Sequence, residues 1–228
     1  MWKTDKELFS IAKKELFTAL VGDVLDQHGY YNQFLPPGLK PVVTNMVTIG
    51  RAMPVLESDI GEQIVRETKD DKIKQPFGLM FEALDDLKPD EVYICSGSTA
   101  SYALWGGLMS IRATKLNAAG AVVNGFIRDT DEIINLSFPT FSLGSYAADQ
   151  GVRGKVVGYR VPIVLGGVVV NPGDIVFGDR DGIIIVPQQL ERTVFEGAIE
   201  KSRGEKLVKK ALEGGMTTVN AFKKFGIM

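Results

Sequence analysis

The sequence has very little cysteine and histidine, with one of each (Cys95 and His28) in 228 residues. One cysteine excludes an internal disulfide and a cysteine-based zinc site, and one histidine excludes HExxH and every two-histidine metal site. A Ser-His-Asp triad is disfavoured for the same reason, and no G-x-S-x-G motif is present. Because such sparing use of cysteine is typical of a reducing compartment, we expect a cytoplasmic protein.

Charge of one sign and long apolar runs are also absent. The 26 Lys and Arg residues face 28 Asp and Glu residues, for a formal net charge of −2. Nucleic-acid-binding domains usually carry a basic stripe, so we expect no nucleic-acid partner. No apolar run approaches the roughly 20 residues of a membrane span, and the charged first residues lack a signal-peptide core, so we expect no membrane association.

The residues that are present fit one α/β domain over 1–228. Hydrophobic residues make up 45% of the chain and charged residues 24%, and no repeat or low-complexity linker divides it. Periodicity and turn signals predict N-terminal helices over 4–29, a βαβ core over about 90–129, a β-rich half over 138–187, and a C-terminal helix and tail over 188–228.

The βαβ core is the most informative part of this pattern. A β-rich run at 91–95 precedes a helix at 108–118, and an apolar strand follows at 121–126. The two strands of such a unit are parallel, and the helix N-terminus lies at the edge where both strands end. Ligands of open α/β sheets bind in crevices at that edge.

Glycines, an arginine and an aspartate gather at this edge. Gly106 and Gly107 open the helix, where backbone N–H groups can approach an anion and the helix dipole favours negative charge. Arg128 adds a planar fork suited to a carboxylate, and Asp129 adds a hard oxygen ligand of the kind that holds Mg²⁺ with waters. The pattern fits a site for a small anionic oxo acid with a divalent cation. It also fits a plain turn beside a solvated Arg-Asp pair or helix cap.

Longer runs around these residues resemble the RraA-like family. That family includes 4-hydroxy-4-methyl-2-oxoglutarate and 4-carboxy-4-hydroxy-2-oxoadipate aldolases. The run 103–109, followed by 120–129, resembles its central signature. Further agreement extends over nearly the whole chain, at 18–26, 168–174, 179–182 and 221–226.

The resemblance implies a domain similar to the swivelling β/β/α fold, with N-terminal helices and a long C-terminal helix. It implies assembly as a homotrimer or a dimer of trimers, with active sites between subunits. Arg128 would contact the pyruvoyl part of the substrate, and Asp129 would ligate Mg²⁺ or Mn²⁺. A catalytic glutamate on the neighbour's C-terminal helix would correspond to Glu205, although from the residues alone a solvated charge is the plainer interpretation.

The resemblance also implies a carboxylate-binding loop at the start of the helix. Backbone N–H groups of Gly107, Leu108 and Met109, beside Gly106, would hold the pyruvate carboxylate. Aldolases of the family usually have Gly-Asp at this loop, so Gly107 is a departure. The missing aspartate belongs near the metal waters and puts full aldolase turnover in question.

The implied activity is metal-dependent cleavage of a 4-hydroxy-2-oxo acid to pyruvate and a second oxo acid, with oxaloacetate decarboxylation as a companion reaction. Two alternatives stay open. One is a non-catalytic regulatory or binding protein on the same scaffold, which Gly107 favours and Asp129 disfavours. The other is a related lyase with a different oxo-acid substrate, for which Gly107 makes extra room.

Overall fold

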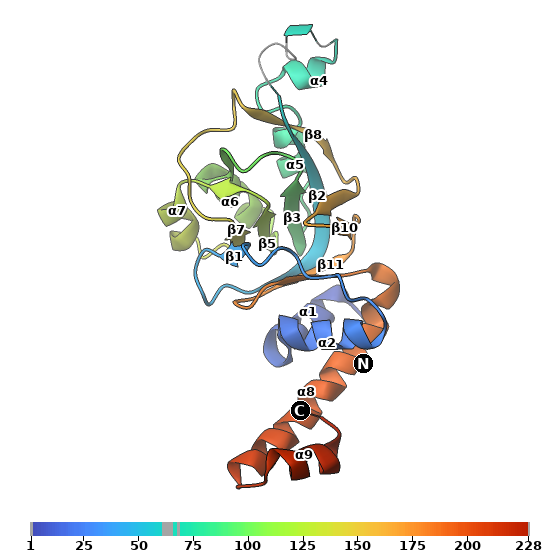
Figure 1. Ribbon diagram of the computed structural model, residues 1–228. Coiled ribbons are helices and arrows are strands. Elements are labelled where there is room, and N and C mark those ends of the chain that lie inside the picture. The colour runs from blue at the N-terminus through green and yellow to red at the C-terminus, as the bar shows by residue number, and fades with distance from the viewer. Residues whose placement is uncertain (1, 61–65, 68, 228) are drawn as a thin grey trace.

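A mixed eight-stranded sheet organises the chain in the computed structural model, which describes residues 2–60, 66–67 and 69–227 (Figure 1). The strand β8 (Gly154–Tyr159) pairs with β2 and lies off the main path. Along that path the order is β1 (Lys40–Pro41), β7 (Thr140–Ser142), β5 (Gly120–Val123), β3 (Glu91–Ser96), β2 (Thr48–Asp59), β11 (Ile175–Gly178) and β12 (Ile183–Val186).

The predicted βαβ core is confirmed. Strands β3 and β5 pair in parallel, and α6 (Gly107–Lys115) connects them. The predicted second strand is wrong at its end, because the chain leaves the main sheet after β5. It forms β6 (Phe126–Ile127), which pairs in parallel with β4 (Ala103–Trp105) in a separate two-stranded sheet. Because β4 ends just before α6, this pairing places the end of β6 close to the start of α6.

Alternation along the central strands explains why both faces of the sheet are covered. On β3, Tyr93 and Cys95 pack toward α5 (Met80–Asp85), α6 and α7 (Thr130–Asn135), while Val92 and Ile94 join a second cluster. That second cluster includes the hairpin of β9 (Ile163–Leu165) and β10 (Val168–Val170). A continuously apolar strand is typical of a sheet buried on both faces.

The predicted N-terminal helices are two, α1 (Asp5–Glu15) and α2 (Thr18–Gln27). The backbone N–H and the hydroxyl of Thr18 both donate to the carboxylate of buried Asp179, each at 2.7 Å. A carboxylate at a helix N-terminus stabilises unpaired N–H groups. Asp179, distant in sequence, therefore fixes where α2 begins.

The predicted C-terminal helix is also confirmed. A 3-10 turn, η1 (Gln188–Leu190), leads into α8 (Glu191–Glu213), and α9 (Thr218–Phe225) follows. The far half of α8 and α9 project away from the sheet (Figure 1). Elsewhere a short helix, α4 (Asp71–Lys74), lies at the opposite end. None of the described helices is long and apolar enough to cross a membrane.

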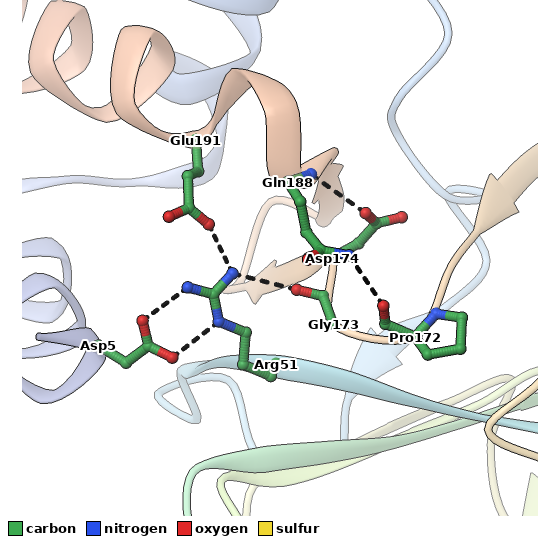
Figure 2. A network of polar contacts seen from close by, with 7 residues as sticks. All are labelled: Asp5, Arg51, Pro172, Gly173, Asp174, Gln188 and Glu191. Atoms are coloured by element: carbon green, nitrogen blue, oxygen red, sulfur yellow. Dashed lines mark hydrogen bonds and ion pairs between the residues drawn. The ribbon is translucent and has the colours of Figure 1, made fainter.

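Arg51 on β2 connects three segments that are far apart in sequence (Figure 2). Its Nε and Nη2 donate to the two oxygens of Asp5 on α1, at 2.8 and 2.6 Å, and this pairing lowers the pKa of Asp5. Its Nη1 donates to Glu191 on α8 and to the carbonyl of Gly173, at 2.5 and 3.1 Å. One guanidinium thus joins both terminal helices to the sheet.

We expect Arg51→Lys to lower the free energy of unfolding by about 1–2 kcal/mol, because an ammonium cannot reproduce the two-pronged bond to Asp5. Urea unfolding followed by circular dichroism measures the change. Lys72→Arg is the control, because it also exchanges arginine and lysine but at an exposed position on α4. It should leave the urea midpoint unchanged. A midpoint that is equal in all three proteins would contradict a structural role for the fork.

Candidate functional site

A cavity of about 260 Å³ opens at the N-terminus of α6. Five of the six residues that the sequence placed at this edge line it, namely Gly106, Leu108, Met109, Arg128 and Asp129. The sixth, Gly107, is buried beside them at the first position of the helix. The structure thus brings together the glycines, the arginine and the aspartate around one space.

Buried hydrogen bonds fix the start of α6. The indole N–H of Trp105 donates to the hydroxyl of Ser110 at 2.7 Å, and that hydroxyl donates to the carbonyl of Gly106 at 3.0 Å. Gly106 has no side chain with which to cap the helix, so the first N–H groups are left for other partners. The N–H of Gly107 donates to Asp129 Oδ2 at 3.2 Å, whereas those of Leu108 and Met109 begin the helix at the cavity.

Asp129 has a left-handed backbone (φ 54°), which is uncommon outside glycine but accessible to aspartate. It occupies the N-cap position of α7, yet its side chain makes no capping hydrogen bond there. Its carboxylate instead turns toward the start of α6 and accepts from Gly107. Asp129 therefore does not cap α7 with its side chain, and it accepts instead from the first N–H group of α6.

Arg128 is held between two carboxylates. Its Nη1 lies 2.8 Å from Asp149 Oδ1, and its Nε lies 3.9 Å from Asp129 Oδ2. Its backbone N–H donates to Trp105, which extends the pairing of β4 with β6. The side chain of Arg128 is about 41% exposed, so an incoming carboxylate can reach it.

Asp149 and Gln150, which also line the cavity, were missed by the sequence analysis. Their loop lies along the small sheet, because Tyr146 N–H donates to Ile127 and Ala103 N–H donates to Ala148, each at 2.8 Å. Two polar residues within the predicted β-rich half were the only available signal. The contact with Arg128 depends on a loop path that no local pattern encodes.

Behind Gln150 lies Glu57, which is 2% exposed. Gln150 Nε2 donates to Glu57 Oε2 at 2.7 Å, while neither Glu57 Oε1 nor the Tyr93 hydroxyl has a hydrogen-bond partner among the described residues. Burial raises the pKa of Glu57 to about 8, outweighing the hydrogen bond from Gln150, which lowers it. Glu57 is therefore a buried acid that holds its proton at neutral pH.

The expectation that Gly107 makes extra room is wrong. A Cβ at this position would lie 1.9 Å from Glu132 Oε2 and 3.2 Å from the Cβ of Asp129. The Glu132 carboxylate, extended from α7, already occupies the space over the glycine. The position where the family's aldolases carry aspartate is thus next to another acidic side chain.

This packing predicts that substitutions at positions 107 and 132 are coupled. In the wild-type background, we expect Gly107→Ala to be destabilising, because the added Cβ would displace the Glu132 carboxylate. In the Glu132→Ala background the same change should cost less, since only the Asp129 Cβ, at 3.2 Å, then lies close to the added Cβ. A double-mutant cycle of urea unfolding measures the coupling. Additive effects would show that the two sites are independent.

The oxygen donors fit Mg²⁺ or Mn²⁺ better than zinc. Across the described residues, no group of three or more His, Cys, Asp or Glu side chains is arranged to hold a metal ion. Asp129 offers one partly exposed carboxylate. Mg²⁺ is commonly bound through one or two carboxylates, with waters and substrate oxygens completing its shell, whereas zinc sites use His and Cys.

The structure places Glu205 apart from these residues within one chain. It lies on α8 and lines a separate cavity with Val208, Lys209, Leu212 and Glu213. The role expected for it was at the site of a neighbouring subunit, and that role stays a prediction.

Comparison with known proteins gives relatives along nearly the whole chain. Protein DlpA of Legionella pneumophila is 27% identical over 205 residues, which cover 90% of this chain but only 31% of DlpA. This chain therefore spans about a third of that relative. A Halalkalibacterium halodurans protein named "Putative 4-hydroxy-4-methyl-2-oxoglutarate aldolase" is also 27% identical, over 90% of this chain and 89% of its own length.

A solved structure and a family model also match this chain. Streptomyces coelicolor RraAS2, described as an unusual member of the RNase ES inhibitor RraA protein family, superposes with a TM-score of 0.75 at 22% identity, over 92% of this chain and 99% of that one. The RraA-like family, described as Aldolase/RraA, matches residues 18–185, which include every residue of the cavity. The chain therefore belongs to the RraA-like family.

Proposed function

We propose that this protein is a divalent-metal-dependent lyase that cleaves a 4-hydroxy-2-oxo acid to pyruvate and a second carbonyl compound. One observation carries the proposal: Arg128, Asp129 and the start of α6, where Gly106 offers no capping side chain, share one cavity. A guanidinium and helix N–H groups bind a carboxylate, and an oxygen ligand beside them holds a hard cation. The name of the H. halodurans relative supports an aldolase.

In this proposal the chain's own groups bind and orient the 2-oxo acid. The N–H groups of Leu108 and Met109 donate to the substrate carboxylate, and Arg128 donates to the 2-oxo acid. Asp149 fixes the direction of the Arg128 guanidinium. Asp129 holds the cation, with Glu132 close to the same helix start. A bound divalent cation supplies a Lewis acid that stabilises negative charge on the 2-oxo oxygen.

The reaction is a retro-aldol cleavage. A base takes the proton of the 4-hydroxyl, the C3–C4 bond breaks, and its electron pair passes to C3 and the 2-oxo oxygen as the pyruvate enolate. Protonation at C3 then gives pyruvate, and C4 leaves as a carbonyl. Decarboxylation of oxaloacetate gives the same enolate, so the cavity would also support that reaction.

Proton exchange tests the proposal without knowledge of the distal half of the substrate. Pyruvate incubated in D₂O with the protein and Mg²⁺ or Mn²⁺ should lose its methyl proton signal by NMR, because the enolate forms reversibly. Addition of EDTA should stop the exchange, and excess Mg²⁺ should restore it. Unchanged methyl protons, together with no calorimetric binding of oxalate in the presence of Mg²⁺, would reject the lyase.

A non-catalytic regulator is the second candidate. Gly107 in place of aspartate and the similarity to RraAS2 favour it. The same two measurements separate it from the lyase, since a regulator predicts neither exchange nor oxalate binding. We further propose trimeric assembly, which would bring Glu205 of one subunit toward the cavity of another; sedimentation measures the assembly, and Glu205→Gln should slow exchange only in the assembled form.

A further inference from the structure

We propose that the acid bound in this cavity is a 4-hydroxy-2-oxo monocarboxylate with an aliphatic or aromatic group at C4, where 4-hydroxy-4-methyl-2-oxoglutarate has a second carboxylate. This inference rests on the proposed function and specifies its substrate class. Cleavage then releases pyruvate and an apolar aldehyde or ketone, with the same proton and electron transfers as above.

The first support is the apolar part of the cavity lining, which we call the apolar wall. It is formed by side chains from α5, from the turn before it, and from the β4 and α6 region. Met80 and Leu84 are buried, and Phe77 packs edge-on against Phe81 with ring centroids 5.7 Å apart. Phe81 lines the cavity and is 52% exposed. Contact with an apolar part of the substrate would remove these side chains from water, which is favourable.

Charge is the second support. Among the described residues that line the cavity, Arg128 is the one cation, and Asp129 and Asp149 are anions. Their net charge is −1, and Glu132 over Gly107 makes it −2, which a divalent cation would balance. Arg128 and the helix N–H groups can pair with one substrate carboxylate. A second carboxylate would have no cationic partner among these residues and would lie against the apolar wall, which is unfavourable.

Space is the third support. The cavity of about 260 Å³ corresponds to roughly nine water volumes at about 30 Å³ each, more than pyruvate alone fills. Arg128 and the start of α6 would hold the carboxylate, and the rest of the lining is mostly apolar, with Met80, Phe81 and Leu84 among its side chains. The part of the substrate beyond C3 therefore meets the apolar wall.

Binding of two uncleavable acids tests the inference directly. 4-Methyl-2-oxopentanoate and 2-oxoglutarate have main chains of equal length, and neither has a 4-hydroxyl, so neither undergoes retro-aldol cleavage. Titration calorimetry with Mg²⁺ should show the branched monocarboxylate binding about 10- to 100-fold more tightly than the dicarboxylate. Equal affinities, or tighter binding of 2-oxoglutarate, would overturn the inference.

A cation placed on the wall should reverse the preference. Phe81→Arg adds a positive charge to the cavity lining at a side chain that is 52% exposed, so folding should be little affected, and it should favour 2-oxoglutarate by at least about 10-fold relative to wild type. Phe222→Arg, at a position that is 56% exposed on α9, is the matched control and should change neither affinity. An unchanged ratio in Phe81→Arg would show that the distal group does not meet this wall.

Proton exchange into pyruvate distinguishes failure of this inference from failure of the proposed lyase function. Pyruvate has no group at C4, so its proton exchange in the wild-type protein reports on the lyase independently of the apolar wall. Exchange without the preference for the branched acid rejects this inference and leaves the lyase. Loss of exchange and of oxalate binding in wild type rejects the lyase, and the inference with it.

Discussion

Arg128→Ala is expected to lower the rate of pyruvate proton exchange by about 10²- to 10³-fold and to weaken oxalate binding by a similar factor. A charged, two-pronged donor to a carboxylate is among the strongest polar contacts that a site can make. The melting temperature should change little, because the side chain is partly exposed and its ion pair with Asp149 is one of the kind that contributes about 0–1 kcal/mol. NMR exchange, calorimetry and thermal unfolding measure these three effects.

Arg112→Ala is the matched control for this variant. Arg112 lies on the same helix, α6, is 43% exposed, and pairs with one aspartate, Asp85, at 2.7 Å. It does not line the cavity, so exchange and oxalate binding should equal those of wild type. If Arg112→Ala lowered exchange as much as Arg128→Ala, the effect would come from a general loss of positive charge near α6.

Glu57→Gln should make the protein more stable at alkaline pH by removing a buried group that resists ionisation. The folded-state pKa of about 8 lies above the ordinary value of 4.5, so the folded protein keeps a proton that the unfolded chain releases between these values. Wild-type stability should therefore fall as the pH rises from about 4.5 to 8. By pH 8 the loss attributable to Glu57 reaches about 4 kcal/mol at ~1.4 kcal/mol per pH unit.

Urea unfolding across this pH range checks the prediction. Glu57→Gln should flatten the profile while keeping an acceptor for Gln150, so its advantage over wild type should grow with pH and vanish near pH 4.5. Glu196→Gln, on the partly exposed face of α8, should leave the profile as it is in wild type. Parallel profiles for wild type and Glu57→Gln would show that this carboxyl ionises normally when folded.

Much of the site follows from local sequence patterns. A strand, a helix and a second strand predicted the parallel pair β3 and β5, and topology then placed Gly106 near Arg128 and Asp129 at one edge. The handedness of peptide chains restricts how such a unit closes, so its strand ends and helix start must meet at one edge. The residues that the resemblance added at the loop line the same cavity or lie beside it.

What the sequence did not reveal depends on distant contacts. Asp149 reaches Arg128 because its loop follows β6, and Glu57 is buried only after β2 is enclosed on both faces. Likewise, α2 begins at Thr18 because the N–H group of Thr18 donates to Asp179, which is distant in sequence. Such positions result from tertiary packing, and neither residue type nor spacing predicts them.

The close packing of Glu132 over Gly107 also constrains how this protein can change over generations. An acidic side chain gained at position 107 would meet an occupied space and a second negative charge. Shortening residue 132 first opens that space. The order of substitutions therefore matters. A shorter residue at position 132 can come before an acidic residue at position 107, whereas the reverse order passes through a disfavoured protein that carries both acidic side chains.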